Sequence, residues 1–530
     1  MLKKLSLLLA FIAFCQIADA AKVITYPVPE TEKIQTIFKV SVNGKPVDLY
    51  RAHSAALNPS RGMEYYFCYF DFEGEVDVRI TSQTGFGKSP SHVIIDPAER
   101  KKRLETIVAE VLPSSINADI SVNEIKFKKD KPFTAIILRE KLDMPLIIFG
   151  NPIEKDVPNP NDPNVVYFGP GVHFIDKPIV LKDNQTLYLA GGAVVKSNLP
   201  DNFPFIEWQN NTGFYEVTDE SLFAKCPNFF PFSAWNAKNV SIRGRGIISF
   251  DNRARFRNHG LLLNNCQNLK IEGVILRDCN TWTLDLRNCN NVDVDNIKIC
   301  GSRMINDDAI DICNSSNVVI RNSFCRAQDD IIAIKGIIGS GKYLGRKITA
   351  DPLDKNNNLP VENIFIEDCI FWTDSANIFR IGYECDAPYF KNIKAKNILV
   401  PSYARGGDPR DEWSNAIVWI QPSKDMVISD VEIDGITIRA NRKECNLLIA
   451  NPRIVHYTKT YGIAENCVIK NVNVFGDPRG FKGTIFVEGV NDKYHANNIK
   501  LENINYFDTK ITKESECVHH GEYANGFEIR

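Results

Sequence analysis

Two pairs of adjacent aspartates, Asp307-Asp308 and Asp329-Asp330, stand in segments that nearly repeat, NDDAIDI at residues 306–312 and QDDIIAI at residues 328–334. Carboxyl groups packed together cannot all ionise independently, because each negative charge raises the cost of the next. One acid then stays protonated while another remains a carboxylate. Such a pair can protonate the oxygen of a departing sugar and deprotonate the water that attacks the sugar carbon. The two segments predict a site that cleaves glycosidic bonds, if the fold brings them together.

Two other roles fit the same aspartates. Asp side chains cap backbone turns, and a group of carboxylates can bind Ca²⁺. The histidines and cysteines have none of the spacings of a zinc site. We expect neither a metal nor a cofactor, and turn capping and calcium binding remain the alternatives.

The elements that must position the aspartates belong to a repeat that spans residues 235–505. An Asn-apolar-x-apolar pattern begins at Asn239, Asn268, Asn291, Asn317, Asn363, Asn392 and Asn498. Strands this short cannot each bury a face alone, but coils stacked in parallel bury a continuous column of inward side chains. Asn suits the turns, since it tolerates the left-handed backbone region and can hydrogen-bond to the matching Asn of the next coil.

This repeat predicts a right-handed parallel β-helix in an all-β chain. A leucine-rich repeat is the competing solenoid, but the coils lack its leucine spacing. The interval from Asp308 to Asp330 is one coil, so the two aspartate pairs are expected on adjacent rungs, roughly 4.8 Å apart along the axis.

The region ahead of the repeat has a different pattern. Short segments alternate like sheet strands at residues 38–42, 65–70, 76–80, 91–95 and 134–138, with an Asn-Gly turn after the first. We expect a small β-sandwich over residues 21–157. The Pro/Asn/Asp-rich residues 158–164 then connect it to a β-helix catalytic domain over residues 158–530.

Residues 1–20 predict a cleavable signal peptide and a secreted or periplasmic protein. They run from Lys3-Lys4 through an apolar stretch to the small-x-small motif at residues 18–20. Acylation at Cys15 is the alternative, although the bulky Phe14 before it disfavours a lipoprotein. No later apolar run approaches the ~20 residues of a membrane span.

The charges and cysteines limit the partners and the crosslinks. Lys and Arg number 63 against 65 Asp and Glu, without a long block of like charge, so nucleic acid and membrane surfaces are not expected partners. Without Cys15, 13 of the 14 cysteines remain, an odd number. We expect buried thiols stacked at one-coil intervals, such as Cys266, Cys289 and Cys313, rather than a disulfide framework.

The paired aspartates resemble those of the polygalacturonase-like β-helix glycosidases. In polygalacturonases an Asn-Thr-Asp-Gly segment is followed one coil later by Asp-Asp, as NDDA at residues 306–309 is followed here by Asp329-Asp330. The resemblance implies that Asp329 is the general acid and that Asp308 and Asp330 activate water, with inversion at the anomeric carbon.

The chain departs from polygalacturonases on the next coil. Those enzymes have Gly-His-Gly where this chain has ANIFRIG at residues 376–382, so Asn377 replaces the His. A clear Arg-Ile-Lys, the cationic pair for a galacturonate carboxylate, is missing. The dextranase and isopullulanase family shares the three Asp, lacks that His and carries a β-sandwich ahead of the helix. The layout is closest to that family, which implies hydrolysis of an α-linked polysaccharide or oligosaccharide.

Eight further residues are expected to contact or orient the substrate: Asn306, Gln328, Lys335, Asn377, Arg380, Tyr383, Trp282 and Trp413. The aromatic rings, with Trp419, can stack on the apolar face of a sugar, although each fits a place in the core as well. The two residues ahead of the aspartate pairs, Asn306 and Gln328, can orient the carboxylates by hydrogen bonds.

Three other functions remain as alternatives. These are a polygalacturonase-like hydrolase of pectic glycans, a polysaccharide lyase with Ca²⁺-binding Asp and an Arg base, and a non-catalytic glycan-binding β-helix. The spacing from Asp308 to Asp329-Asp330 favours hydrolysis.

Overall fold

The computed structural model describes residues 21–54, 63–87, 98, 102, 105–139, 145–198, 230–251, 260–279, 281–301, 306–337, 358–411, 413–455 and 458–530. The predicted signal peptide, the predicted strand at 91–95 and Cys226 lie outside these residues. No helix in the described ranges is both long and apolar enough to cross a membrane.

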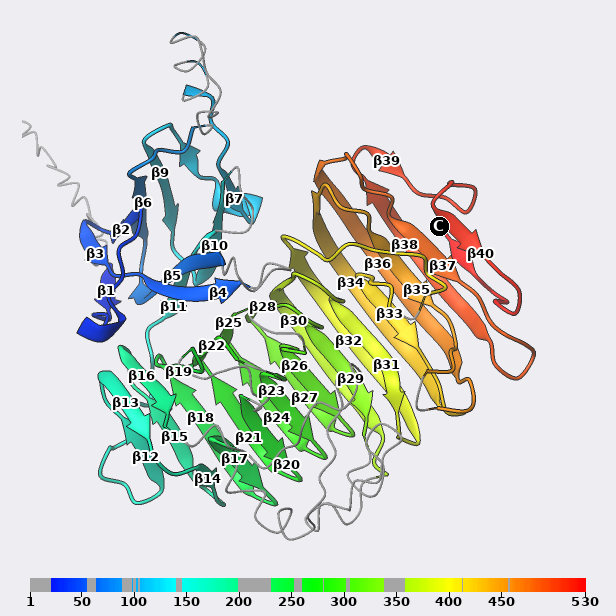
Figure 1. Cartoon of the computed structure of the whole chain (residues 1–530), viewed down its shortest axis with the longest axis horizontal. Coiled ribbons are helices and arrows are strands. Elements are labelled where there is room, and N and C mark those ends of the chain that lie inside the picture. Colours follow the sequence, from blue (N-terminus) through cyan, green and yellow to red (C-terminus); the bar gives the residue numbers. More distant parts are fainter. Residues whose placement is uncertain are drawn as a thin grey trace, which may run out of the picture.

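Two sheets that face each other form an N-terminal β-sandwich (Figure 1). One sheet contains β1 (Lys22–Thr25), β5 (Met63–Glu73), β11 (Leu146–Pro152), β10 (Phe133–Leu138) and β7 (Glu110–Leu112), with β4 (Tyr50–Ser54) paired to β5. The other contains β3 (Lys45–Val47), β2 (Phe38–Val42), β6 (Val76–Ser82), β9 (Glu124–Lys129) and β8 (Asp119–Ile120). Short 3-10 turns occur at Glu30–Glu32 and Ser114–Ile116. Asn43 and Gly44 take positive φ angles of 49° and 77° in the hairpin between β2 and β3, as the Asn-Gly pair predicts.

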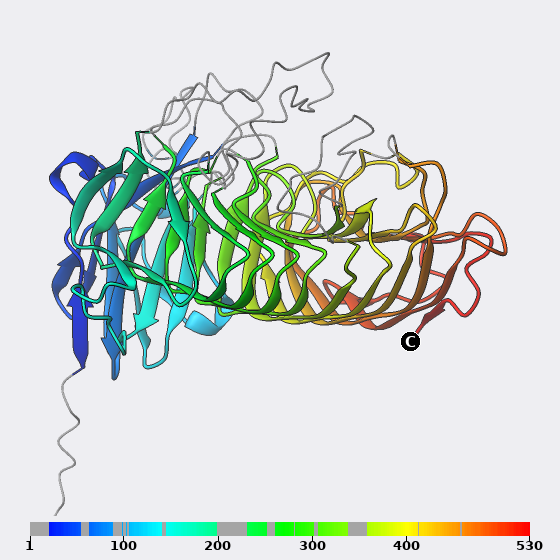
Figure 2. The same ribbon diagram turned by 90° about the horizontal axis from the view of Figure 1, so that it is seen from below.

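The rest of the described chain is a right-handed parallel β-helix, so the predicted fold class is confirmed (Figures 1 and 2). One 11-stranded wall consists of β14 (Ile179–Leu181), β17 (Phe232–Trp235), β20 (Leu261–Asn264), β23 (Leu284–Arg287), β26 (Ile310–Cys313), β29 (Ile332–Gly336), β31 (Phe379–Cys385), β33 (Val418–Gln421), β35 (Asn446–Ala450), β37 (Thr484–Val487) and β40 (Val518–His520). We call it the aspartate wall, because the connections into β26 and β29 carry the paired aspartates.

The other walls form one 19-stranded sheet, since their strands merge in the later coils. Its strands are β12 (Val165–Phe168), β13 (Gly171–Ile175), β15 (Thr186–Leu189), β16 (Ala193–Ser197), β18 (Lys238–Gly244), β19 (Ile247–Ser249), β21 (Gln267–Glu272), β22 (Ile275–Arg277), β24 (Asn290–Asp295), β25 (Lys298–Cys300), β27 (Ser316–Arg321), β28 (Phe324–Ala327), β30 (Val361–Thr373), β32 (Tyr389–Val400), β34 (Val427–Asn441), β36 (Ile463–Asp477), β38 (Ala496–Tyr506), β39 (Thr509–Lys510) and β41 (Glu528–Ile529). β30 pairs with both β27 and β28, and from there one long strand serves each coil.

Asparagines hold the turns in the predicted way. Asn239, Asn268 and Asn291 have φ between 57° and 59°, in the left-handed region. Asn268 Nδ2 donates to Asn239 Oδ1 at 2.9 Å, and Asn291 Nδ2 donates to Asn268 Oδ1 at 2.8 Å. The same bond joins Asn392 to Asn363 at 2.7 Å. The ladder therefore fixes the register of coils from outside the core.

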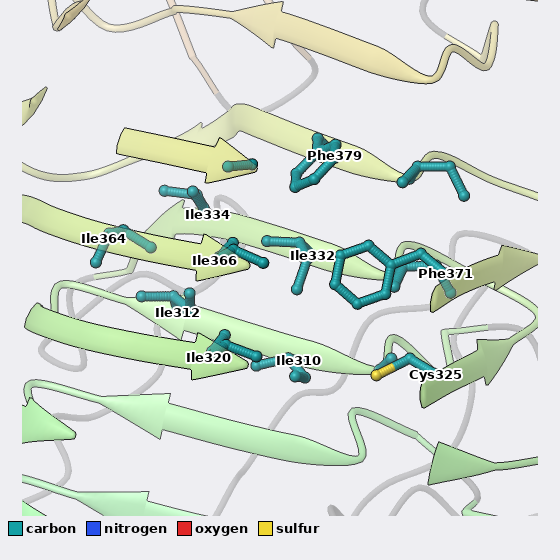
Figure 3. Packing of buried hydrophobic residues seen from close by; sticks show 14 of the residues in the cluster. Ile310, Ile312, Ile320, Cys325, Ile332, Ile334, Ile364, Ile366, Phe371 and Phe379 are labelled. Atoms are coloured by element: carbon teal, nitrogen blue, oxygen red, sulfur yellow. The ribbon is translucent and has the colours of Figure 1, made fainter. Parts of the chain in front are cut away.

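Inward side chains fill the helix with aliphatic columns. Ile310 and Ile312 of β26 stack on Ile332 and Ile334 of β29, and all four are fully buried (Figure 3). Because strand side chains alternate, residues next to these isoleucines, such as Asp311 and Lys335, point out from the wall.

The cysteine prediction is partly wrong. Cys266 and Cys289 are stacked and buried, but Cys313 lies on the outer face, packed with Trp282 and Ile337. The register of this coil places Asn290 beside Ser316, so Ser315 rather than Cys313 takes the stacked place. Its hydroxyl accepts from Cys289 N at 2.9 Å. All twelve described cysteines are free thiols.

The sandwich packs against the first half of the solenoid (Figure 1). Phe149 of β11 meets Phe324 of β28 edge-on, with 5.4 Å between ring centroids. Arg245 Nε donates to both carboxylate oxygens of Asp71 in β5, at 2.9 and 3.0 Å, and both residues are buried. An apolar contact and a buried ion pair therefore join the two parts.

Candidate active site

The two similar segments, residues 306–312 and 328–334, lie on neighbouring coils that stack on each other. Ile310 of β26 pairs with Ile332 of β29, so the residues ahead of each strand are brought side by side. Ala309 N donates to Asp330 O at 2.8 Å, and Ile331 N donates to Asn377 O at 3.0 Å. Asp308, Asp330 and Asn377 therefore occupy the same position on three successive rungs.

The three aspartates converge. One carboxylate oxygen from each of Asp308, Asp329 and Asp330 lies within 4.8 Å of the other two. Two hydrogen bonds of about 2.8 Å can bridge such a gap through one water molecule. Asp308 and Asp330 are 3% and 8% exposed, whereas Asp329 keeps more of its surface in solvent. Asp329 is therefore the most accessible of the three.

Backbone donors orient Asp329. Its Oδ2 accepts from Asn306 N at 3.0 Å, and its Oδ1 accepts from Asp330 N at 3.0 Å. Burial, followed by the negative charges of Asp308 and Asp330, raises the pKa of Asp329 well above its usual value. The surroundings of Asp329 therefore favour its protonated form.

Asn377 fixes the third aspartate. Its backbone N and its Nδ2 donate to Asp330 Oδ1 at 2.9 and 2.7 Å, and its Oδ1 accepts from Ala416 N at 2.8 Å. Asn377 is 2% exposed and links three coils. It holds a carboxylate in place and has little surface left for the substrate.

Asp307 is a functional neighbour that the sequence reasoning did not select. Its Oδ1 accepts from Gln328 N at 2.7 Å and from Asp329 N at 3.1 Å. Gln328 thus contributes through its backbone, and among the described residues its side-chain oxygen has no donor. Asp307 shapes the turn that aims Asp329, and the doubled Asp in residues 306–308 was the available signal.

Lys335 is surrounded by acids and an indole. Its Nζ lies 2.7 Å from Asp308 Oδ2, 2.7 Å from Asp311 Oδ1 and 3.8 Å from the centroid of the Trp282 ring. Lys335 is 4% exposed and Trp282 is 7% exposed. Both predicted substrate contacts therefore lie mainly beneath the surface of the site.

The charges of this group are coupled. Burial raises the pKa of Asp308, against the opposing effect of Lys335, and burial raises the pKa of Asp311 still further. Burial lowers the pKa of Lys335, but the facing Asp308 and Asp311 outweigh it and the net pKa is well above normal. Lys335 is therefore the charged counter-ion of Asp308, and burial favours the protonated form of Asp311.

A β-bulge brings a further acid, Glu384, to the site. Ile334 pairs with Ile381 but Gly336 pairs with Cys385, so Lys335 faces three residues of β31. Tyr383 takes a positive φ of 71° there. Burial, Lys335 and Asp308 are the main influences on Glu384, and its pKa is raised. Bulges re-aim side chains in this way, and strand periodicity gives no sign of them.

Arg380 lies among aromatic rings. Its guanidinium carbon is 4.7 Å from the ring centroid of Tyr383 and 4.2 Å from that of Trp419. Arg380 is 7% exposed and neighbours Ala333, whose small side chain leaves room for it. Trp419 is fully buried, so the prediction that it stacks on a sugar is wrong.

Trp413 lies apart from this group. It is 70% exposed, on the connection between β32 and β33, which enters the aspartate wall two coils beyond Asp330. The structure therefore gathers the three aspartates, Lys335, Asn377 and Arg380, with Trp413 at a distance along the same edge.

The three aspartates are also the candidate metal ligands of the described chain. Ca²⁺ needs six to eight oxygens, but Lys335 already occupies an oxygen of Asp308, and Asn377 donates twice to Asp330. A buried ammonium at this distance repels a second cation. The donor set suits proton transfer better than calcium.

Comparison with known proteins gives a family match and several similar folds. Residues 239–477 match the family described as Glycosyl hydrolases family 28. A probable polygalacturonase of Arabidopsis thaliana is 29% identical over 197 residues, which cover 33% of this chain and 43% of that protein. The match thus spans less than half of the relative's length.

Among solved structures, Dex49A from Penicillium minioluteum has a TM-score of 0.55 at 13% identity, covering 96% of each chain. An exopolygalacturonase from Thermotoga maritima has a TM-score of 0.48 at 15% identity, covering 66% of this chain and 85% of that one. At this level of identity the first similarity concerns the fold, and it includes both the sandwich and the solenoid.

Proposed function

We propose that this chain is a glycoside hydrolase of the polygalacturonase-like kind, related to the glycosyl hydrolases family 28 whose model residues 239–477 match, and that it hydrolyses glycosidic bonds in an α-linked glycan. The convergence of Asp308, Asp329 and Asp330 within 4.8 Å is the observation that carries the proposal. It supplies a protonated acid beside carboxylates that can bind a water molecule.

The reaction follows from the protonation of these groups. Asp329 gives its proton to the glycosidic oxygen as the bond from that oxygen to the anomeric carbon breaks. Water held by Asp308 and Asp330 attacks the same carbon and loses a proton to them. Transfer of that proton to Asp329, through solvent, restores the starting state.

Lys335 and Asn377 prepare the base. Lys335 stabilises the charged form of Asp308 at 2.7 Å, and Asn377 fixes one oxygen of Asp330 with two hydrogen bonds. Asp330 Oδ2 is left for the water. Both residues act through the aspartates, so we assign them positioning roles instead of direct substrate binding.

A neutral α-glycan of the dextran type is the preferred substrate class. Lys335 is already paired with two acids, and Arg380 is stacked between two rings, so neither is an open cation for a uronate. The similarity of fold to Dex49A across 96% of the chain agrees with this choice. A pectic glycan is the second candidate, favoured by the polygalacturonase-like relative.

We also propose that the protein is exported, because residues 1–20 have the pattern of a signal peptide and a polysaccharide substrate is met outside the cytoplasm. N-terminal sequencing of the protein from its native host tests this. A mature start near Ala21 supports export, whereas an intact Met1 contradicts it.

The substrate is tested by supplying dextran, pullulan, polygalacturonate and a sulfated galactan and measuring new reducing ends. We expect the fastest release from dextran or another neutral α-glucan. Release of reducing ends from polygalacturonate alone would mean that the substrate is a pectic glycan and not a neutral α-glucan. Products that absorb in the near ultraviolet would identify a lyase instead.

The stereochemistry is tested by NMR of the first product. We propose inversion, as the resemblance implies. The nearest aspartate oxygens, however, lie closer than the roughly 6.5–9.5 Å that separates the carboxyl groups of most inverting enzymes. An anomer opposite to that of the substrate supports single displacement. Retention would turn one of these carboxylates into a nucleophile.

A further inference from the structure

The connection between β32 and β33, described over residues 401–411 and 413–417, presents a large aromatic side chain to solvent at the edge of the aspartate wall. Trp413 is 70% exposed, more than any other large hydrophobic residue of the described chain. Single exposed hydrophobic residues are normal on protein surfaces, so exposure alone carries no function. Two further features of this loop point to a function: its hydrogen bonds to the next coil and its place in the coil register.

The loop is fastened to the next coil on both sides of Trp413. Asn446, 3% exposed, donates through Nδ2 to Ser414 Oγ at 3.0 Å and to Asn415 O at 2.9 Å. Arg453 donates to Pro409 O at 3.3 Å. Because these bonds hold the backbone, a ligand on the indole does not have to order the loop around it.

A turn within the loop holds the backbone of Trp413. Asp411 Oδ1 accepts from Trp413 N at 3.0 Å, and Ser414 N donates to Asp411 O at 3.2 Å. Hydrogen bonds thus hold the backbone of Trp413 while its ring stays in solvent. A solvated aromatic face on a held backbone suits carbohydrate binding, since the face of a sugar ring packs on it.

The coil register gives the distance from the aspartates. Ile331 N donates to Asn377 O, and Ile378 N donates to Ala416 O, so Ala416 is two rungs beyond Asp330. Two rungs correspond to about 10 Å along the axis. Trp413 precedes Ala416 on the same edge, within one short turn. An oligosaccharide can span this separation, but a single ring at the cleavage point cannot.

We propose that Trp413 is a stacking platform for a distal sugar of the substrate, on the side of the cleaved bond toward the C-terminal coils. This inference rests on the proposed function, because it places the glycan across the three aspartates. The site selects for chain length: short substrates reach only the aspartates, and longer ones also reach the indole.

The test compares Trp413→Ala with the wild type on oligosaccharides of increasing length, isomaltose through isomaltoheptaose. We expect kcat/KM to fall about tenfold for the long members and to stay unchanged for the shortest one that is cleaved. Phe174→Ala removes a ring that is 52% exposed on β13 and is the matched control, with no effect at any length. A uniform loss, or no loss at any length, would overturn the platform.

A binding experiment separates this inference from the proposed function. Calorimetry with isomaltoheptaose compares Asp329→Asn with the double variant Asp329→Asn/Trp413→Ala. Weaker binding by the double variant, by about tenfold, supports the platform even if no turnover is found. Equal affinities contradict it, including the case in which neither variant binds. A different measurement tests the proposed function itself. It is contradicted if the wild-type protein turns over substrate and Asp329→Asn does not reduce that turnover.

Discussion

At the residue scale, the site is a set of acids whose protonation is divided by their surroundings. Asp329 is pushed toward its neutral form by burial and by two neighbouring carboxylates. Asp308 faces the ammonium of Lys335 at 2.7 Å, which favours its charged form. One cluster can therefore hold a protonated carboxyl group beside a carboxylate, the two forms that the proposed reaction needs.

The pKa of Asp329 predicts a pH effect on both rate and stability. Because that pKa is raised, activity should fall as pH rises through it and the general acid loses its proton. The folded state holds this proton more tightly than the unfolded chain, so its stabilising effect is present at acid pH and lost as pH rises. Asp329→Asn should therefore unfold at an equal or higher temperature than wild type at pH 7, with the gain vanishing in acid. A variant that is less stable only at pH 7 contradicts the raised pKa.

The ion pair between Lys335 and Asp308 predicts that substitution of Lys335 changes the acid side of the pH–rate profile. Lys335→Met removes the counter-ion of Asp308, so the pKa of Asp308 should rise and the acid limb of kcat/KM should move to higher pH. Lys335→Arg keeps the charge and should restore the limb in part. A lower rate with an unmoved limb would mean that Lys335 is only structural. Circular dichroism of both variants checks their folding.

At the element scale, the β-helix converts a sequence interval into a contact. The interval between the two aspartate pairs equals the register of β26 on β29, and the Asn ladder keeps that register where turns would otherwise slip. Coil lengths nevertheless vary, because the step from Asn290 to Ser316 on the adjoining wall is longer than the step from Ile310 to Ile332. The aspartates meet because the interval between them equals the length of their own coil.

Substitutions of Asn268 test the ladder. Asn268→Ala must keep a φ of 58° with a Cβ and also loses the bonds to Asn239 and Asn291. We expect a loss of about 2 kcal/mol in unfolding free energy. Asn268→Gly removes the same bonds without the backbone cost, so its smaller loss measures the ladder itself. Thermal unfolding of the three proteins is the measurement, and equal stability of all three would contradict the role of the ladder.

The sequence predicted the features that repeat and missed those that break the repeat. The Asn turns, the inward aliphatics and the stacked aspartate pairs all follow from periodicity. Cys313 was misplaced because its coil is longer than the step from Cys289 to Cys313, which brings Ser315 into the stacked place. Glu384 was missed because the bulge after Ile381 breaks the alternation of the strand. Lys335 was assigned to the substrate, since nothing in the sequence revealed that two acids already surround it.

At the scale of the whole molecule, the sandwich and the solenoid share a buried interface. The rings of Tyr65, Phe67 and Phe149 pack against the outer faces of β22, β25 and β28. Asp71 and Arg245, 0% and 3% exposed, form an ion pair inside this contact. Breaking one side of a buried pair leaves an uncompensated charge, which costs more than removing both.

Asp71→Asn should therefore destabilise the protein by about 3–5 kcal/mol, because the buried guanidinium of Arg245 loses the carboxylate to which its Nε donates. The double variant Asp71→Asn/Arg245→Met should recover part of that loss. Thermal unfolding measures both. A single variant as stable as wild type would mean that the pair contributes nothing to the interface.

Turnover by Asp329→Asn is the most direct test of the hydrolase as a whole. The amide keeps the size of the side chain but has no proton to give to the glycosidic oxygen. On the glycan that the wild-type protein cleaves fastest, we expect kcat to fall about 10²–10⁴-fold while binding of that glycan is retained. An unchanged kcat would contradict the acid role of Asp329 and with it the proposed mechanism.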